Sequence, residues 1–316
     1  MPGSLTRILK RWRDNYYLST VLANSARPVH RASRYMAGQI EKRIRKNGAT
    51  VPLSNGVNLI LARDAGVGIT SLLYWHGLDG YEPETSRCLR SLFVRSETFV
   101  DVGANCGLYS VLGALLNPSL RVIAFEPVAG IFAGLQRNVR LNGVESRVRC
   151  ENVALSSQSG RATLFLPAHD GIDPETTGTL AAESWQARKS APRVEVEAIR
   201  FDEYEAQHPM RTDLVKIDVE DFESDVLDGM RSVIMRDRPF IVCEILPRQH
   251  GNQRTRALVE SFQYQPYWIT PAGYVRVGRF DFNRGNWTDF LLSPVSTPDT
   301  VIDDLSTLVE LRRARP

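Results

Sequence analysis

The stretch from Glu97 to Ser110, ETFVDVGANCGLYS, constrains the fold more than any other part of the chain. It opens with β-branched and aromatic residues, Thr98 to Val102, then breaks at a turn from Gly103 to Gly107, after which leucines and valines recur at helical spacing. This order predicts a strand, a glycine turn and a helix. Such a turn brings backbone N–H groups and a helix N-terminus close to a ligand, and we expect Asp101, near the end of the strand, to be aimed at the same place.

Length and composition favour one large α/β domain with an N-terminal extension. The chain has 316 residues, of which 43% are hydrophobic and 24% charged. It has no apolar run approaching the roughly 18 residues that span a bilayer, and its basic N-terminus lacks the apolar core of a signal peptide. Its cysteines form no C-x-x-C or Cys/His pair, which speaks against structural zinc and disulfides and favours a cytoplasmic location. They are Cys88, Cys106, Cys150 and Cys243.

The positive charge is concentrated in residues 1–46. This arm holds eleven Lys and Arg against two acids, a net charge of +9, which leaves −6 for the remainder because the whole chain carries +3. Its apolar residues from Leu5 to Tyr16 recur at three- and four-residue intervals and predict a basic amphipathic helix. The helix packs either on the main domain or a second subunit of a homo-oligomer, or it rests on anionic lipid at the inner face of the membrane. A nucleic-acid contact fits less well, because the aromatic residues lie on the apolar face and not among the cations.

Strands and helices alternate along the rest of the chain. Residues 51–70 show a strand-like pattern broken by glycines, which predicts a small hairpin, and strands ending in acidic or polar residues follow. We expect a helical extension at 1–50, one domain at 51–298 and a C-terminal tail at 299–316. Within the domain, the polar residues 167–193 interrupt the rhythm and predict a lid or a specificity insert. The expected strands after residue 97 are Thr98–Val102, Arg121–Pro127, Val148–Leu155, Ala162–Leu166, Val194–Ile199, Asp213–Asp218, Pro239–Glu244, Tyr267–Ile269, Tyr274–Val277 and Asp289–Leu292.

Acidic residues gather where these strands end. Such a repeating pattern predicts a doubly wound sheet, in which ligands bind at the carboxyl ends of the strands. Any one of the acids could serve only as the N-cap of the next helix, but the set together points to a ligand. Its members are Asp101, Glu126, Asp218, Glu244 and the pair Glu220 and Glu223.

The ligand that suits this edge is a cationic nucleoside. The spacing Gly103-x-x-x-Gly107 is not the G-x-G-x-x-G of dinucleotide-binding folds, and Asp101 would repel a pyrophosphate. S-adenosylmethionine carries a sulfonium and an α-ammonium and no phosphate. Glu126 is then placed to accept the ribose hydroxyls, while Asn152 and the Val153 amide would meet the adenine edge.

Several motifs, in order, resemble the FkbM-type S-adenosylmethionine-dependent methyltransferases. They are Tyr81-Glu82-Pro83-Glu84-Thr85, VDVGANCGLYS from Val100, Phe125-Glu126-Pro127, Leu135-x-x-Asn138-x-x-x-Asn142, Val153-Ala154-Leu155-Ser156, Leu214-Val215-Lys216-Ile217-Asp218-Val219-Glu220 and Asp289-Phe290-Leu291-Leu292. The resemblance covers about residues 51–295. It departs from the family pattern at Asp221, where glycine is usual, and at Asp289, where asparagine is common.

The resemblance implies a class I methyltransferase (Rossmann-like) fold with a mostly parallel seven-stranded sheet and an antiparallel C-terminal edge. It also implies O-methylation of a hydroxyl on a sugar, a glycolipid or another natural product. The cofactor-binding residues predicted from the motifs and the resemblance are Glu82, Thr85, Asp101, Gly103, Ala104, Asn105, Gly107, Glu126, Pro127, Asn152, Val153 and Asp218.

Methyl transfer from a sulfonium is an in-line displacement, so the protein must orient the acceptor hydroxyl and remove its proton. Asp218 is the first candidate for this work, with Glu220, Glu244 and the titratable His250 nearby in sequence. The acids Asp218, Glu220 and Glu244 could instead bind Mg²⁺ or another divalent cation. Two other functions stay open, a nucleic-acid methyltransferase that uses the basic arm and a non-catalytic cofactor-binding partner subunit. Against the former, the acids after Ile217 would repel phosphate.

Overall fold

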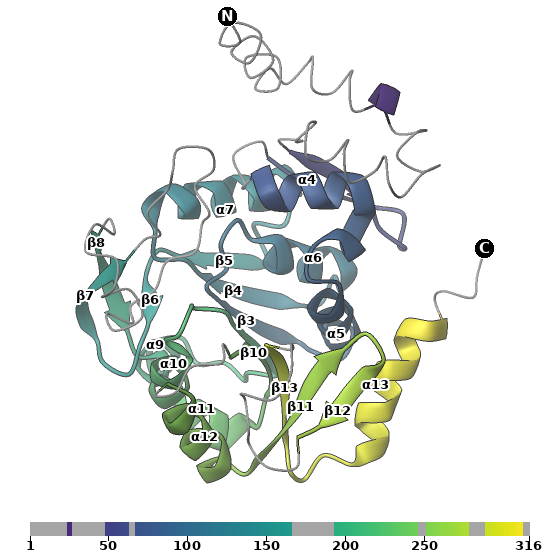
Figure 1. The fold of residues 1–316 in the computed structure, drawn as a ribbon. Helices are drawn as coiled ribbons and strands as arrows, with labels where there is room; N and C mark the ends of the chain where they lie inside the picture. Colours follow the sequence, from purple (N-terminus) through teal and green to yellow (C-terminus); the bar gives the residue numbers. More distant parts are fainter. Residues whose placement is uncertain are drawn as a thin grey trace, which may run out of the picture.

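In the part of the chain that the structure describes, an eight-stranded sheet forms the centre. The computed structural model describes residues 24–26, 48–62, 67–165, 193–245, 251–277 and 288–311. In chain order, the strands of the main sheet are β3 (Thr98–Val102), β4 (Arg121–Phe125), β5 (Val148–Glu151), β9 (Leu214–Ile217), β10 (Phe240–Glu244), β11 (Tyr264–Thr270), β12 (Gly273–Arg276) and β13 (Asp289–Pro294). They lie side by side in the order β12-β11-β13-β10-β9-β3-β4-β5 (Figure 1).

The sheet has a parallel core and an antiparallel edge. Strands β5, β4, β3, β9 and β10 are parallel to one another, whereas β13 runs antiparallel to both β10 and β11. The predicted doubly wound architecture with an antiparallel C-terminal edge is therefore confirmed. Within the described residues the sheet has eight strands and not the predicted seven, because Gly273–Arg276 pairs with β11 and extends the edge.

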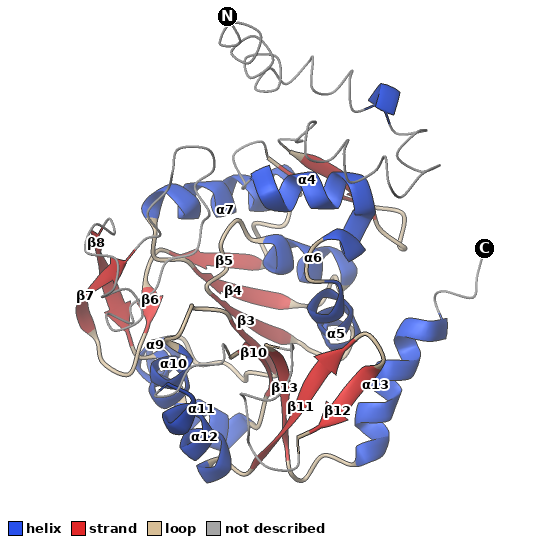
Figure 2. Cartoon of the chain, in the orientation of Figure 1, coloured by secondary structure: helices blue, strands red, loops and turns tan. Residues whose placement is uncertain are grey.

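Helices cover both faces of the sheet (Figure 2). Successive side chains of a strand point to opposite faces of the sheet. On β3, Phe99 therefore packs with one set of helices, whereas Val100 and Val102 pack with the other. On the first face lie α4 (Val67–His76), α5 (Pro83–Phe93), α6 (Leu108–Leu116), α7 (Ala129–Leu141) and α13 (Asp299–Leu311). On the second lie α9 (Phe201–Gln207), α10 (Glu223–Gly229), α11 (Arg231–Asp237) and α12 (Gly251–Ser261).

The predicted N-terminal hairpin is confirmed but shorter than expected. Strands β1 (Ala49–Pro52) and β2 (Asn58–Leu61) pair antiparallel. Residues 67–70, which the strand-like pattern included, belong to α4, because Thr70 and Leu73 are buried at helical spacing. The short 3₁₀ helix η1 (Gly77–Gly80) then leads into α5.

Part of one predicted strand belongs to a separate, smaller sheet. The sequence pattern predicted one strand from Val148 to Leu155, but the chain leaves the main sheet after β5 and forms β6 (Ala154–Leu155). Strand β6 pairs with β8 (Arg193–Ile199) through Ala154 opposite Ala198, and β7 (Gly160–Phe165) pairs with the other edge of β8. The strand is divided because its second half pairs with β8 and not with β4.

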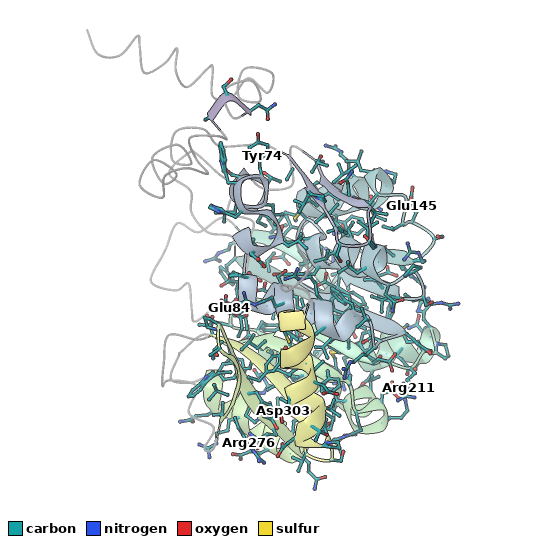
Figure 3. All side chains as sticks on the ribbon, turned by 90° about the vertical axis from the view of Figure 1, so that its right-hand side faces the viewer. Tyr74, Glu84, Glu145, Arg211, Arg276 and Asp303 are labelled. Atoms are coloured by element: carbon teal, nitrogen blue, oxygen red, sulfur yellow. The ribbon has the colours of Figure 1, made fainter. Side chains whose placement is uncertain are left out.

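The residues predicted as a C-terminal tail contain a packed helix. Ile302 and Leu305 of α13 are buried, and the helix lies beside α5 and β12 (Figures 1 and 3). Three predictions fall outside the described residues: nearly all of the basic arm 1–46, the insert 167–193 apart from its last residue, and His250. Among the helices that the structure describes, none is both long and apolar enough to cross a bilayer.

Candidate active site

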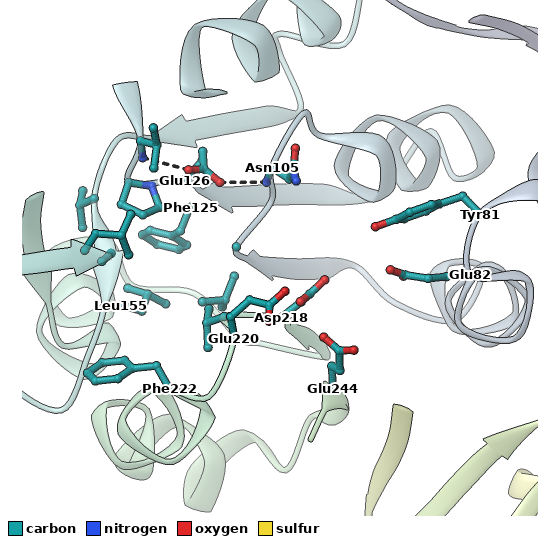
Figure 4. Close-up of a pocket in the computed structure, with 18 residues that line it drawn as sticks. Tyr81, Glu82, Asn105, Phe125, Glu126, Leu155, Asp218, Glu220, Phe222 and Glu244 are labelled. Carbon is teal, nitrogen blue, oxygen red and sulfur yellow. Dashed lines mark hydrogen bonds between the residues drawn. The ribbon is translucent and has the colours of Figure 1, made fainter. Parts of the chain in front are cut away.

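A pocket opens at the carboxyl ends of β3, β4, β9 and β10, the edge at which the sequence predicted a ligand (Figure 4). One end is apolar and includes Leu155 and Phe222, whereas the other end is acidic and includes Glu82 and Glu244. The described residues that line it include no Lys or Arg. They are Tyr81, Glu82, Val102, Gly103, Asn105, Phe125, Glu126, Pro127, Val128, Val153, Ala154, Leu155, Leu164, Asp218, Val219, Glu220, Phe222 and Glu244.

The glycine turn after β3 is tied to the neighbouring strand. The N–H groups of Gly103 and Ala104 both donate to the carbonyl oxygen of Phe125, at 3.1 and 2.9 Å. Gly103 and Asn105 adopt left-handed conformations, with φ of 75° and 51°, and Gly107, at φ 80°, is the N-cap of α6. The first two amides of the turn are therefore used within the fold and do not face the pocket as free donors.

Glu126 is held by two backbone amides. Its Oε2 accepts the Asn105 N–H at 3.1 Å and its Oε1 accepts the Val128 N–H at 2.9 Å (Figure 4). Burial raises the pKa of this carboxyl to about 7 although both hydrogen bonds favour its ionised form. Each oxygen keeps a further lone pair, so the carboxylate can accept ligand hydroxyls without leaving its place.

Asn152 does not line the pocket, in contrast to the predicted contact with adenine. Its Nδ2 donates to the carbonyl oxygens of Glu126 and Pro127, at 2.8 and 3.0 Å. The side chain thus turns back onto the loop after β4, where it finds two backbone acceptors. Asn152 fixes the backbone that carries Glu126, and the next residue, Val153, lines the pocket instead.

Asp101 is also absent from the lining, contrary to the prediction that it points at the ligand. Strand alternation places its side chain on the face covered by α6, where Ser110 Oγ donates to its Oδ2 at 2.5 Å and 1% of the residue is exposed. Burial raises the pKa of this carboxyl. Its Oδ1 has no hydrogen-bond partner within the described part of the chain. Asp101 lies beneath the site and not in it.

Lys216 and Asp218 form a buried ion pair at the end of β9. The Nζ of Lys216 lies 2.8 Å from Oδ2 of Asp218 and 5.3 Å from the centroid of the Tyr109 ring. Burial by itself would lower the pKa of Lys216, but the carboxylates of Asp218, Glu82 and Asp101 hold it above the ordinary value. In return, the ammonium offsets the effect of burial on Asp218 and keeps the pKa of that carboxyl below its usual range.

Glu82 and Glu244 complete the acidic end. Glu82 adopts the left-handed conformation at φ 40°, and its Oε2 accepts the Tyr109 hydroxyl at 2.9 Å. Glu244 ends β10 opposite Asp289 of β13. Burial, followed by the charges of Asp218 and Asp289, raises the pKa of Glu244, and burial also raises that of Glu82.

Carboxylate oxygens of Asp218, Glu220 and Glu244 lie within 4.8 Å of one another, so these three residues could share one cation. The turn after β9, which carries Asp218 and Glu220, bends sharply, with φ of 52° at Glu220 and 76° at Asp221. Asp221 therefore occupies a backbone conformation that favours glycine, the residue that the family pattern has there.

The structure brings together most of the predicted site residues. Those that line the pocket are Glu82, Gly103, Asn105, Glu126, Pro127, Val153, Asp218, Glu220 and Glu244. Those that do not line it are Thr85, Asp101, Ala104, Gly107 and Asn152, and His250 lies outside the described residues.

Tyr81 and most apolar residues of the lining were not predicted from the sequence, whereas Pro127 and Val153 were. Tyr81 and Phe222 each stand within two residues of a predicted acid, a proximity that could have drawn attention to them. Phe125 and Leu155 are the last residues of strands β4 and β6. Their position at the ends of strands was the one feature of the sequence that could have indicated that they line the pocket. Because both are apolar residues of strands, they were expected to pack in the hydrophobic core.

The comparisons with known proteins give one matching family and several similar methyltransferases. Residues 101–266 match the methyltransferase FkbM domain. The chain is 32% identical over 169 residues to methyltransferase sdnD of Sordaria araneosa, across 46% of this chain and 65% of that protein. It is 30% identical over 152 residues to 31-O-demethyl-FK506 methyltransferase FkbM of Streptomyces tacrolimicus, across 41% of this chain and 58% of that protein.

Among solved structures, methyltransferase FkbM from Methylobacillus flagellatus KT aligns with 16% identity and a TM-score of 0.41, over 74% of this chain and 56% of that one. The chain thus spans less than two thirds of the length of both curated relatives named above. The domain match nevertheless covers more than half of the chain and includes the carboxyl ends of the strands that build the pocket. The chain belongs to the methyltransferase FkbM family.

Proposed function

We propose that the pocket binds S-adenosylmethionine and that the protein methylates a hydroxyl of a sugar, a glycolipid or another natural product. The observation that carries this proposal is the distribution of polarity along the pocket. An apolar end, a central carboxylate at Glu126 and an acidic end follow one another, and the described lining has no Lys or Arg that would hold a phosphate.

The lining residues suit each part of this ligand. The apolar surface around Phe125, Val153 and Leu155 fits an adenine ring, and Glu126 fits the two ribose hydroxyls. Glu82 and Asp218 fit the cationic end. S-adenosylmethionine, when bound, supplies an electrophilic methyl group on its sulfonium.

The acids at the end of β9 and β10 suit the removal of a hydroxyl proton. Asp218 is kept ionised by Lys216, and the environment of Glu244 raises its affinity for a proton. Because the two carboxyls lie at the ends of adjacent strands, we propose that they orient the acceptor hydroxyl and take its proton. Glu220 is a further acceptor for hydroxyls of the same substrate.

The negative charge at the acidic end of the pocket also restricts the chemical class of acceptor that can bind there. Glu82, Asp218, Glu220 and Glu244 would repel a phosphate or a carboxylate, whereas their oxygens accept hydrogen bonds from neutral hydroxyls. A neutral polyhydroxylated acceptor therefore suits the pocket better than a nucleic acid. The activity named for the Streptomyces tacrolimicus relative, methylation of an oxygen on a natural product, supports the same class.

Titration calorimetry with S-adenosylhomocysteine tests the cofactor assignment. In Glu126→Gln only one oxygen remains, so an amide NH₂ must face either the Asn105 N–H or the Val128 N–H. We expect the affinity to fall roughly 10- to 100-fold, the equivalent of about 1.5–3 kcal/mol for a charge-assisted hydrogen bond. The exposed Glu260→Gln, on α12, is the matched control and should bind as the wild type does. Equal affinity in wild type and Glu126→Gln would contradict the assignment.

Incubation with a methyl-labelled donor and separate lipid, polysaccharide and RNA fractions tests the acceptor class. We expect label in the lipid or polysaccharide fraction. Label confined to RNA would overturn the proposed acceptor.

A further inference from the structure

Lys216 occupies an unusual place for a cation. The chain has five lysines, and Lys216 is the one that falls within the described residues. It is 5% exposed, on the central strand β9. A buried lysine with no opposite charge nearby would be costly, so its neighbours must explain its presence.

Acids from three separate elements surround the ammonium. Asp218 comes directly after strand β9, and its Oδ2 lies 2.8 Å from Nζ of Lys216. Asp101 stands directly beside Lys216 in the parallel register of β3 and β9, so the two side chains share one face of the sheet. Glu82, before α5, is the third carboxylate whose charge acts on Lys216.

One of these acids also belongs to the group that could bind a cation. Asp218, Glu220 and Glu244 present three carboxylate oxygens within 4.8 Å, a spacing that a Mg²⁺ or Mn²⁺ ion could span. Asp218 is already paired with the ammonium. A divalent ion bound to Asp218 would lie close to that ammonium and would be repelled by it in surroundings of low polarity.

We propose that Lys216 is a positioning residue that acts as the fixed internal cation of the acidic site and takes the place of a divalent metal ion. It holds Asp218 in one orientation and neutralises part of the acidic cluster, so the pocket needs no metal ion to bring carboxylates together. Its effect on methyl transfer rests on the proposed function, whereas its effect on metal binding does not.

Mn²⁺ binding, measured by calorimetry and electron paramagnetic resonance without donor or acceptor, tests the proposal. We expect at most weak binding by the wild type and by Lys216→Arg, which keeps the charge. Lys216→Met should bind Mn²⁺ at least roughly 100-fold more tightly, because the repelling charge is gone. Micromolar Mn²⁺ binding by the wild type, or equally weak binding by folded Lys216→Met, would overturn the proposal.

Arg236→Met is the matched control. Arg236 pairs with Glu205 at 3.0 Å and Asp237 at 2.7 Å on α11, so the substitution also removes a cation from two carboxylates. We expect it to leave Mn²⁺ binding unchanged, whereas an equal gain of affinity there would show that any pair of carboxylates responds to the loss of its cation and would contradict the special role of Lys216.

A second variant covers the case in which Lys216→Met does not fold. Lys216→Met combined with Asp101→Asn removes one cation and one buried anion together, and it keeps Asp218, Glu220 and Glu244. It should show the same gain in Mn²⁺ affinity.

S-adenosylhomocysteine binding by wild type in EDTA gives an independent result: unchanged affinity fits the proposal, and loss of binding that Mn²⁺ restores contradicts it. Failure of methyl transfer with all acceptors would refute the proposed function and leave these two measurements intact.

Discussion

At the scale of single residues, Gly103 shows that the glycine turn is shaped by the fold as much as by its ligand. A Cβ built on Gly103 would lie 2.0 Å from the carbonyl oxygen of Asp218, because the turn after β3 crosses the end of β9. Its φ of 75° also disfavours any side chain. The residue is glycine because the backbone of a neighbouring strand occupies the space, and that strand carries Asp218 into the pocket.

Gly103→Ala should therefore destabilise the protein severely. The Cβ must displace the Asp218 carbonyl, and we expect the free energy of unfolding to fall by at least about 3 kcal/mol. Gly143→Ala is the control, since Gly143 has a similar φ of 63° but no atom within 4 Å of the added Cβ. It should cost only about 1 kcal/mol, the penalty for a left-handed residue. Urea unfolding of both variants checks this, and equal losses would show that the clash is relieved without cost.

At the scale of elements, two asparagines at the C-terminal end of α7 hold the N-terminal hairpin to the domain. Asn138 Oδ1 accepts the Ala62 N–H at 2.7 Å and its Nδ2 donates to the Cys106 carbonyl at 2.8 Å. One turn later, Asn142 exchanges two hydrogen bonds with the backbone of Ile60, at 2.9 and 2.7 Å. The Asn138-x-x-x-Asn142 spacing thus places both amides on one side of the helix, against the edge strand β2. Asn138 also reaches the turn that precedes α6.

Asn138→Ala and Asn142→Ala should differ in cost although they remove the same chemical group. Asn138 is fully buried, so its loss leaves the buried Cys106 carbonyl and the partly buried Ala62 N–H without a partner, at a cost of about 2–4 kcal/mol. The hydrogen bonds between Asn142 and Ile60 lie at the surface, where water replaces them, and we expect a loss of less than about 1 kcal/mol. Urea unfolding measures both. A larger loss for Asn142→Ala would show that the surface contact, not the buried one, holds the hairpin.

At the scale of the whole molecule, buried carboxyls should make stability depend on pH. Burial raises the pKa of Glu223 to about 8, and of Glu126 and Asp289 to about 7, from ordinary values of 4.5 or below. The folded protein therefore binds protons that the unfolded chain releases between about pH 4.5 and 8. Because the unfolded state holds fewer protons in this window, the free energy of unfolding falls as the pH rises through it.

Glu223→Gln tests this dependence. The substitution replaces the buried carboxyl with a neutral group of the same shape that can still accept the Asp221 N–H. We expect the wild type to lose stability from pH 6 to pH 8 and the variant to lose less, by up to about 2 kcal/mol. Urea unfolding at both pH values, with Glu260→Gln as the exposed control, measures the difference. A wild type that gains stability over this range would contradict the sign.

The amino-acid sequence is enough to predict the order of strands and helices, the edge of the sheet where the site lies and most of the acids that line it. These features are local: apolar periodicity, a glycine turn and the residue at which each strand ends can be read within one segment. The register between strands is not local. Asp101 and Lys216 are 115 positions apart, and only the pairing of β3 with β9 makes them neighbours.

For the same reason, three features follow from packing between distant segments: Asp101 lies under the site, Asn152 binds the loop after β4 and Tyr81 reaches the pocket. It also divided the strand predicted at Val148–Leu155 and added an eighth strand to the sheet, because partners distant in sequence decide which edge a segment joins. An acidic side chain at the end of a strand can point either toward the ligand or into the helical layer that covers the sheet. The side chain of Asp101 points into that layer, because it binds Ser110 of α6, which packs on β3.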